Sequence, residues 1–160
     1  MASVEEMAEW SPWVPSEEAL QTAPLLPGVY MAREGADGPL VYVGMAGERA
    51  GGGRPKGLRG RLSVYLTGKG VVSGLGEAAM DRALADPAWV RARLAELERG
   101  EPRRAKEWGR AALSRAGLQI RWTTVPSADA ARALENRILA ALADTGLWNR
   151  GKTVVFKFRE

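Results

Sequence analysis

The chain has 160 residues, of which 46% are apolar, and a net charge of +4, so we expect one domain with a substantial core. It has no cysteine and no histidine, which excludes disulfides, thiolate and imidazole metal sites, and histidine-based acid–base catalysis. Any metal must be held by oxygen ligands, which favours Mg2+ or Mn2+. No run of about 18 apolar residues and no signal-peptide pattern is present, so we expect a cytoplasmic protein without a membrane span.

The first 26 residues form an acidic segment that we expect to be an arm or a short helix docked through Trp10 and Trp13. Residues 1–27 contain five glutamates and no Lys or Arg, so residues 28–160 carry +9. A part of the chain this basic is consistent with a polyanionic partner, although an Arg-rich composition alone gives the same charge. The acidic segment has two open interpretations: an ordinary terminus, or a mimic of phosphate charge that covers the basic face until DNA displaces it.

Residues 28–44, "GVYMAREGADGPLVYVG", have the pattern of a β-hairpin with turn residues in "EGADG". If the turn centres on Ala36, Tyr30 and Tyr42 are directly opposed and their phenols stand side by side on one face. Two interpretations are open: a cross-strand packing pair, or a pair of hydroxyls held for chemistry.

A glycine-rich basic loop at 47–57 precedes "LRGRLSVYL", which has helical spacing. Arg61 and Tyr65 are four residues apart and lie on the same side of this helix. Leu58 and Leu62 can bury the adjacent side against the sheet, which would carry Arg61 and Tyr65 toward the rim of the hairpin. The alternative is a surface arginine beside a core tyrosine.

Residues 73–116 are predicted to be helical. Asp86 is a predicted N-cap with Pro87 at the first helical position, and Gly100 follows the end of that helix. The next segment, "PRRAKEWGRAALSRAG", is strongly basic.

The alternation in "LQIRWTTVP" predicts a strand, and a last helix is expected from near Asp129 to Gly146. The segment "TVVFKF", within residues 151–160, is predicted to be a terminal strand or tail. This order of elements predicts an α+β fold with helices packed on a small antiparallel sheet.

Glu135 interrupts the apolar face of the last predicted helix. At about 100° per residue, it falls inside the arc that runs from Leu134 through Ile138 to Leu139. A carboxylate in an apolar stripe is costly unless a cation or hydrogen bonds compensate it. It is either a metal ligand or a glutamate at the edge of the stripe, paired with Arg61.

Together these pieces resemble the GIY-YIG nuclease family. "GVY" is followed after eleven residues by "YVG", and the order continues with an arginine and a tyrosine in the next helix, a glutamate in "LENRIL" and an asparagine in "LWNR". The matching residues are Tyr30, Tyr42, Arg61, Tyr65, Glu135 and Asn149. The resemblance spans residues 27–150, with 73–116 as a helical insertion. It implies a three-stranded antiparallel sheet flanked by helices and metal-dependent hydrolysis of DNA phosphodiester bonds.

The resemblance also implies a role for each residue. Tyr30 and Tyr42 would lie at the scissile phosphate, where one of them positions or deprotonates the attacking water. A free phenol has a pKa of about 10, so acting as a base requires cationic surroundings. Arg61 would bind the phosphate and stabilise the transition state. Tyr65 stands where other members have a histidine or a tyrosine.

On the metal side, the resemblance implies that Glu135 is the only protein ligand to one Mg2+ or Mn2+, with waters and phosphate oxygens completing the shell. Asn149 would brace the glutamate or the first tyrosine. One departure is Met45, which stands where some members have a lysine; Lys56 is a possible substitute.

Basic residues in the glycine-rich loop and the insertion are the predicted contacts to DNA phosphates, although each alone is an ordinary surface charge. They are Arg49, Arg54, Lys56, Arg59, Arg103, Arg104, Lys106 and Arg110.

The sequence thus predicts a GIY-YIG-type DNA endonuclease, a phosphodiester hydrolase. The alternatives are a nucleic-acid-binding module with this fold but no turnover, and a helical adaptor for a protein partner with the tyrosines in its core. The sequence does not decide which DNA is cut or whether one strand or both are cut. It also does not decide whether the protein is a monomer or a homodimer.

Overall fold

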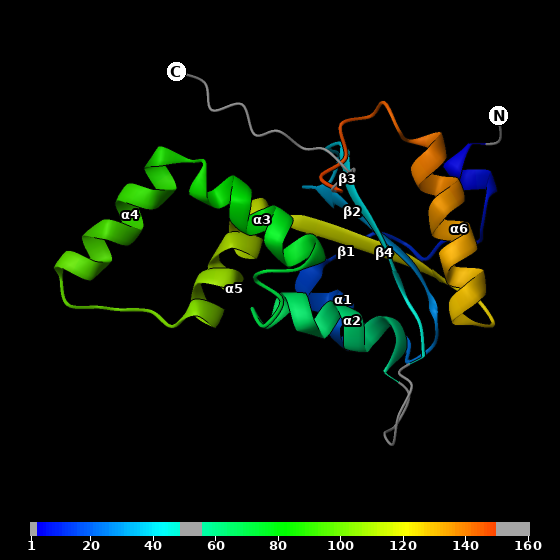
Figure 1. The fold of residues 1–160 in the computed structure, drawn as a ribbon, viewed down its shortest axis with the longest axis horizontal. Helices are drawn as coiled ribbons and strands as arrows, with labels where there is room; N and C mark the ends of the chain where they lie inside the picture. The colour runs from blue at the N-terminus through cyan, green and yellow to red at the C-terminus, as the bar shows by residue number, and fades with distance from the viewer. Residues whose placement is uncertain (1–2, 49–55, 150–160) are drawn as a thin grey trace.

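The computed structural model describes residues 3–48 and 56–149, and within them the fold is α+β, a four-stranded antiparallel sheet with six α-helices (Figure 1). The strands are β1 (Val14–Pro15), β2 (Gly28–Glu34), β3 (Leu40–Ala46) and β4 (Leu118–Thr124), in the order β1-β4-β2-β3. The helices are α1 (Ser16–Thr22), α2 (Gly57–Leu66), α3 (Gly74–Leu84), α4 (Pro87–Glu98), α5 (Ala105–Ala116) and α6 (Ala128–Ala141), and a short 3-10 helix, η1, spans Val4–Glu6.

The sheet has one strand more than the three that we predicted. The additional strand, β1, comes from the acidic N-terminal segment, where Val14 pairs with Ile120 and Pro15 with Gln119. Two residues, one of them a proline, show no alternation that a sequence pattern could reveal. Because β1 extends the β4 side, β3 remains an edge strand.

The predicted hairpin is present, but its register differs from the predicted one. Tyr30 pairs with Gly44, and Tyr42 pairs with Ala32, so the two tyrosines are diagonal neighbours rather than direct partners. The register shifts between Ala32 and Arg33, where β3 carries an extra residue. Since the offset from the predicted register is two residues, both phenols remain on the same face of the sheet.

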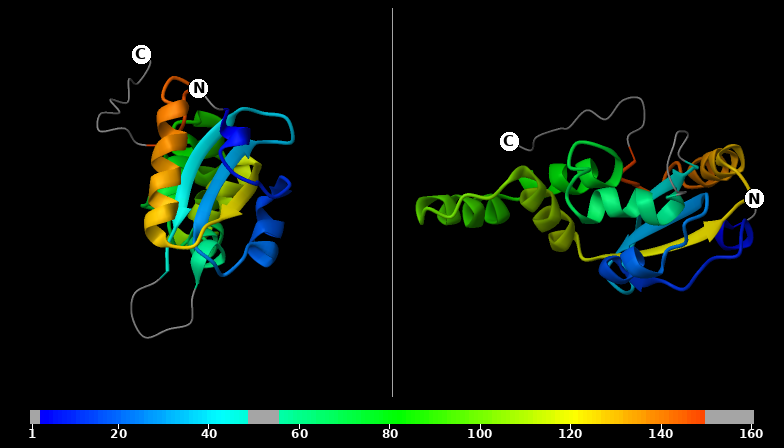
Figure 2. Two further views of the ribbon diagram at one scale, coloured as in Figure 1. Left: turned by 90° about the vertical axis from the view of Figure 1, so that its right-hand side faces the viewer. Right: turned by 90° about the horizontal axis from the view of Figure 1, so that it is seen from below.

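Helices cover both faces of the sheet (Figure 2). On one face, apolar side chains of β2, β3 and β4 pack with α1, α2, α3 and α5; this core includes Tyr30, Leu58, Leu62, Leu75 and Ile120. On the other face, α6 and the N-terminal segment cover Val29, Met31 and Val43. The tyrosines therefore lie on the α2 face and the predicted metal ligand on the α6 face.

The N-terminal segment is docked through its tryptophans, as predicted. The Arg121 guanidinium on β4 lies between the rings of Trp10 and Trp13, at 4.9 and 4.6 Å from their centroids. Arg121 is 7% exposed and pairs with Glu5, which lowers the Glu5 pKa. This pair lies on the α6 face of the sheet, opposite the face that α2 covers.

The helices predicted between 73 and 116 are present as α3, α4 and α5. Asp86 caps α4 as predicted, accepting hydrogen bonds from the backbone N–H groups of Ala88 and Trp89 at 3.0 and 3.3 Å. Figure 1 shows α4 projecting away from the sheet. Its Trp89 ring meets Trp108 of α5 edge-on, with centroids 5.5 Å apart.

The last helix, α6, ends at Ala141, earlier than the predicted Gly146. The predicted terminal strand at 151–160 lies outside the described residues. Within the described ranges, no helix is both long enough and apolar enough to cross a membrane.

Candidate active site at the edge of the sheet

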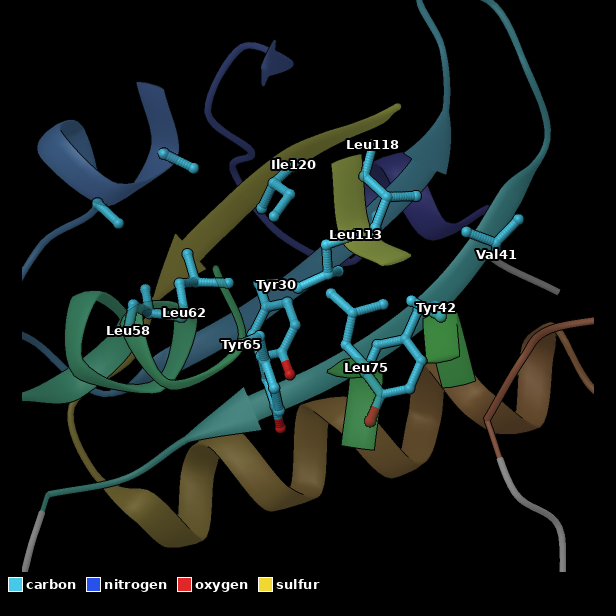
Figure 3. Packing of buried hydrophobic residues seen from close by; sticks show 14 of the residues in the cluster. Tyr30, Val41, Tyr42, Leu58, Leu62, Tyr65, Leu75, Leu113, Leu118 and Ile120 are labelled. Carbon is cyan, nitrogen blue, oxygen red and sulfur yellow. The ribbon is translucent and has the colours of Figure 1, made fainter. Parts of the chain in front are cut away.

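The three tyrosines of the chain form one cluster on the α2 face. The Tyr30 ring is 6.2 Å from that of Tyr42 and nearly parallel to it, with an interplanar angle of 22°. Tyr65, from α2, is 6.4 Å from Tyr30 and tilted by 50°. In Figure 3 the three hydroxyls point the same way, across β3. The rings serve as core, since Tyr30 is 1% and Tyr65 4% exposed, while their hydroxyls gather near the edge strand.

Two glycines make room for this cluster. Gly44, the last residue of "YVG", faces Tyr30 across the hairpin, and a Cβ there would collide with the phenol ring. Gly74 begins α3 with φ of +51°, and a Cβ at this position would collide with the Tyr65 hydroxyl and crowd that of Tyr42. The insertion therefore starts directly against the tyrosine hydroxyls.

Arg61 is exposed on α2, one turn before the buried Tyr65. Its positive charge acts on the hydroxyls of Tyr30 and Tyr42 and on the carboxylate of Glu135, where it offsets part of the rise in pKa that burial causes in all three groups. The arginine is therefore close enough to act on three members of the predicted catalytic set. Both sequence interpretations hold in part: the tyrosine is in the core, and the arginine faces the site.

Glu135 reaches the same place from α6. It is only half-buried, beside the buried Leu134 and Ile138. Burial raises its pKa, while Arg132, Arg61 and the backbone N–H of Met45 each act in the opposite direction. The sequence left two alternatives for Glu135, a metal ligand or a partner of Arg61. Pairing with Arg61 alone does not describe the site, because no salt bridge joins the two side chains among the described residues.

Asn149 braces the edge strand rather than the glutamate or the first tyrosine, which corrects the predicted role. Its side chain accepts a hydrogen bond from the Val43 N–H at 2.9 Å and donates one to the Val43 carbonyl at 2.6 Å. Next to it, the Trp148 N–H donates to the Val41 carbonyl at 2.6 Å. Glu135 also accepts a hydrogen bond from the Met45 backbone N–H. Together these contacts are made at Val41, Val43 and Met45, which are every second residue along the edge of β3.

The surroundings raise the pKa of two phenols rather than lowering it. Burial is the main cause for both, and the Tyr65 phenol adds to it; Arg61 only partly offsets the effect. Tyr30 and Tyr42 are therefore neutral hydroxyls at neutral pH. In that state they can orient a water or a phosphate oxygen, but they are poor bases.

The residues present fit a divalent cation only as a largely hydrated ion. The described residues contain no group of three or more acidic side chains that could form a dedicated site. Glu135 is a single half-buried carboxylate at an edge of the sheet. One carboxylate together with waters and phosphate oxygens is an arrangement that Mg2+ accepts. Glu135 would thus hold the ion, which would supply charge stabilisation at the phosphate.

The predicted DNA contacts fall into separate places. Lys56 lies beside Arg61 on a shared pocket, whereas Arg103 and Arg110 line a shallow pocket on the insertion. Arg59 is held internally, donating to the Ala23 carbonyl at 2.7 Å. The other two on the insertion, Arg104 and Lys106, are exposed at the start of α5. The remaining two, Arg49 and Arg54, lie outside the described residues.

Sequence reasoning missed three residues near the site. Lys69, which lines the Arg61 pocket, follows α2 in "TGKG", where a lysine between two glycines carries no distinctive signal. Gly74, in "VVSGLGE", likewise carries no signal in the sequence of its contact with the tyrosines. The third is Arg82 of α3, whose guanidinium lies 4.3 Å from the ring centroid of Trp148 and so supports the segment that carries Asn149.

No family model, curated protein or solved structure matches this chain.

Proposed function

We propose that this protein is a metal-dependent DNA endonuclease that hydrolyses phosphodiester bonds, with a GIY-YIG-type active site. The observation that carries the proposal is the convergence of Tyr30, Tyr42, Arg61, Tyr65 and Glu135 from four elements at one edge of the sheet. These residues are spread over more than 100 positions of the sequence. A packing role for the tyrosines does not require an arginine and a half-buried carboxylate beside their hydroxyls.

In this proposal each side chain acts as its surroundings allow. Arg61 binds the scissile phosphate and stabilises the charge that builds on it. The neutral hydroxyls of Tyr30 and Tyr42 orient the attacking water and a phosphate oxygen. Glu135 holds Mg2+ or Mn2+, and Asn149 keeps β3 in place.

A nucleic-acid-binding module without turnover is the second candidate. The observation that favours it is that the described part of the site shows no suitable base: the Tyr30 and Tyr42 pKa values are raised, and the partly buried Met45 packs beneath α6. Binding without cleavage would then be the result at every metal concentration.

The test is incubation of the purified chain with supercoiled plasmid, with and without Mg2+ or Mn2+. We expect metal-dependent nicked or linear product, reduced by roughly 100-fold or more in Tyr30→Phe and in Glu135→Gln. Glu98→Gln, which alters an exposed glutamate of α4, is the matched control and should cut normally. Intact plasmid together with salt-sensitive binding would instead identify the binding module.

A further inference from the structure

Arg61 of the candidate site also lines a basic pocket of about 310 Å3. The pocket lies between the end of β3, at Ala46 and Gly47, and the side of α2 that carries Gly57, Gly60 and Arg61. Glycine at position 60 allows this arrangement, because a Cβ there would collide with the Cβ of Lys56. Lys56 can therefore lie against the helix beside Arg61.

The described residues that line the pocket include three cationic side chains, Lys56, Arg61 and Lys69, and no carboxylate. All three are exposed. None of them forms a salt bridge within the described ranges. Three like charges around one concavity repel each other, and an anion placed between them relieves that repulsion.

The pocket and the candidate active site share Arg61. On one side, its charge acts on Tyr30, Tyr42 and Glu135; on the other, it lines the pocket. An anion in the pocket and a phosphate at the tyrosine hydroxyls would therefore both interact with Arg61. Successive phosphates of a nucleic-acid strand are two neighbouring anions of this kind.

We propose that this pocket is a second phosphate subsite, in which Lys56 and Lys69 hold the DNA backbone phosphate that neighbours the scissile one. The nature of the anion rests on the proposed function; the pocket and its charge do not. Lysine binds phosphate as a mobile point charge and reads no base, so the subsite contributes affinity and alignment rather than sequence preference.

The test uses the double variant Lys56→Gln/Lys69→Gln and measures binding to a short DNA duplex, in EDTA, over a range of salt concentrations. Each lost phosphate contact should reduce the salt dependence by about 0.9 in log Kd against log salt concentration. Since the two lysines hold one phosphate, we expect a slope smaller by about 0.9 and weaker binding at low salt. If cleavage occurs, KM should rise while kcat stays near its parent value, because this binding is equal in the ground and transition states.

The matched control is Arg91→Gln/Arg137→Gln, which removes two exposed charges from α4 and α6, away from the pocket. A slope change in the lysine variant no larger than in this control would overturn the proposal, as would a parent chain that does not bind DNA. Thermal unfolding of both variants checks that they remain folded. Binding is measured without metal and so does not depend on cleavage. A chain that binds DNA without cleaving it would refute the endonuclease, and the slope of log Kd against log salt concentration would still test the subsite.

Discussion

At the scale of single residues, the surroundings of three site residues disfavour the charged forms of their side chains. Burial raises the pKa of Tyr30, Tyr42 and Glu135, and Arg61 offsets only part of that effect. Shifted pKa values of this kind are typical of sites kept for chemistry. At neutral pH only the Glu135 shift costs stability, because the phenols are neutral in the folded and the unfolded chain alike. This cost can be measured.

Replacing Glu135 with glutamine should raise the free energy of unfolding at pH 7. Because the Glu135 pKa is raised in the folded state, the fold favours its protonated form, so its contribution to stability is present below the ordinary glutamate pKa and is lost as pH rises through the raised value. The gain from Glu135→Gln should therefore shrink on acidification. Denaturant unfolding at several pH values measures it; Glu98→Gln, the control, should change stability by less than about 0.5 kcal/mol.

Gly44→Ala should displace the Tyr30 ring, because the new Cβ would collide with it. Overpacking of this kind costs about 1–3 kcal/mol. In a Tyr30→Leu background the same substitution should cost less, because the side chain it meets is shorter. Denaturant unfolding of the four proteins gives the coupling energy, and a coupling near zero would show that Gly44 does not make room for the tyrosine.

At the scale of elements, the open edge of β3 organises the site. The tyrosines cross β3 from one face, Glu135 comes from the helix on the other, and residues 148–149 pair along the edge itself. The Arg82 contact with Trp148 ties this segment to α3 of the insertion. The insertion therefore supports the site at two points, here and at Gly74.

Asn149→Ala should destabilise the fold by about 1–2 kcal/mol, because it removes two hydrogen bonds to the Val43 backbone. Cleavage should fall with it, since β3 carries Tyr42. Asn149→Asp keeps the acceptor for the Val43 N–H but turns a carboxylate oxygen toward the Val43 carbonyl, so it should not restore the stability. Loss of cleavage at unchanged stability in Asn149→Ala would point instead to direct contact with the substrate.

At the scale of the whole molecule, the acidic N-terminal segment belongs to the fold. It supplies β1 and α1, and Glu5 is committed to Arg121 on the face opposite α2. This position does not cover Arg61, so the idea that Glu5 restrains DNA binding loses its geometric basis. Deleting residues 1–22 would remove a strand and a helix, and a point substitution is the better test.

Glu5→Gln should leave DNA affinity at low salt within about twofold of the parent after allowing for one added unit of net charge. It should lower stability at pH 7 by less than about 1 kcal/mol, because Glu5 is largely exposed. Since Arg121 lowers the Glu5 pKa, this difference is present above the ordinary glutamate pKa and fades as pH falls through the lowered value. A large increase in affinity would restore the restraining role.

Local patterns in the sequence were sufficient for most of the elements. Alternation and turn residues predicted the hairpin and β4, and Asp86 with Pro87 predicted the start of α4, because these signals depend on near neighbours in the chain. The apolar arc of α6 placed Glu135 beside buried residues, as the structure has it. Composition alone limited any metal site to oxygen ligands.

Only the tertiary structure decided the register of the hairpin, the fourth strand and the partner of Asn149. Each depends on contacts between segments far apart in the sequence: Pro15 with Gln119, and Asn149 with Val43. The same is true of the pocket, where Lys56 and Lys69 meet Arg61 only because α2 folds against the end of β3. Residue types and local periodicity identify the side chains that could take part in chemistry. Which of them come into contact depends on the packing of the whole core, and local sequence patterns do not determine that packing.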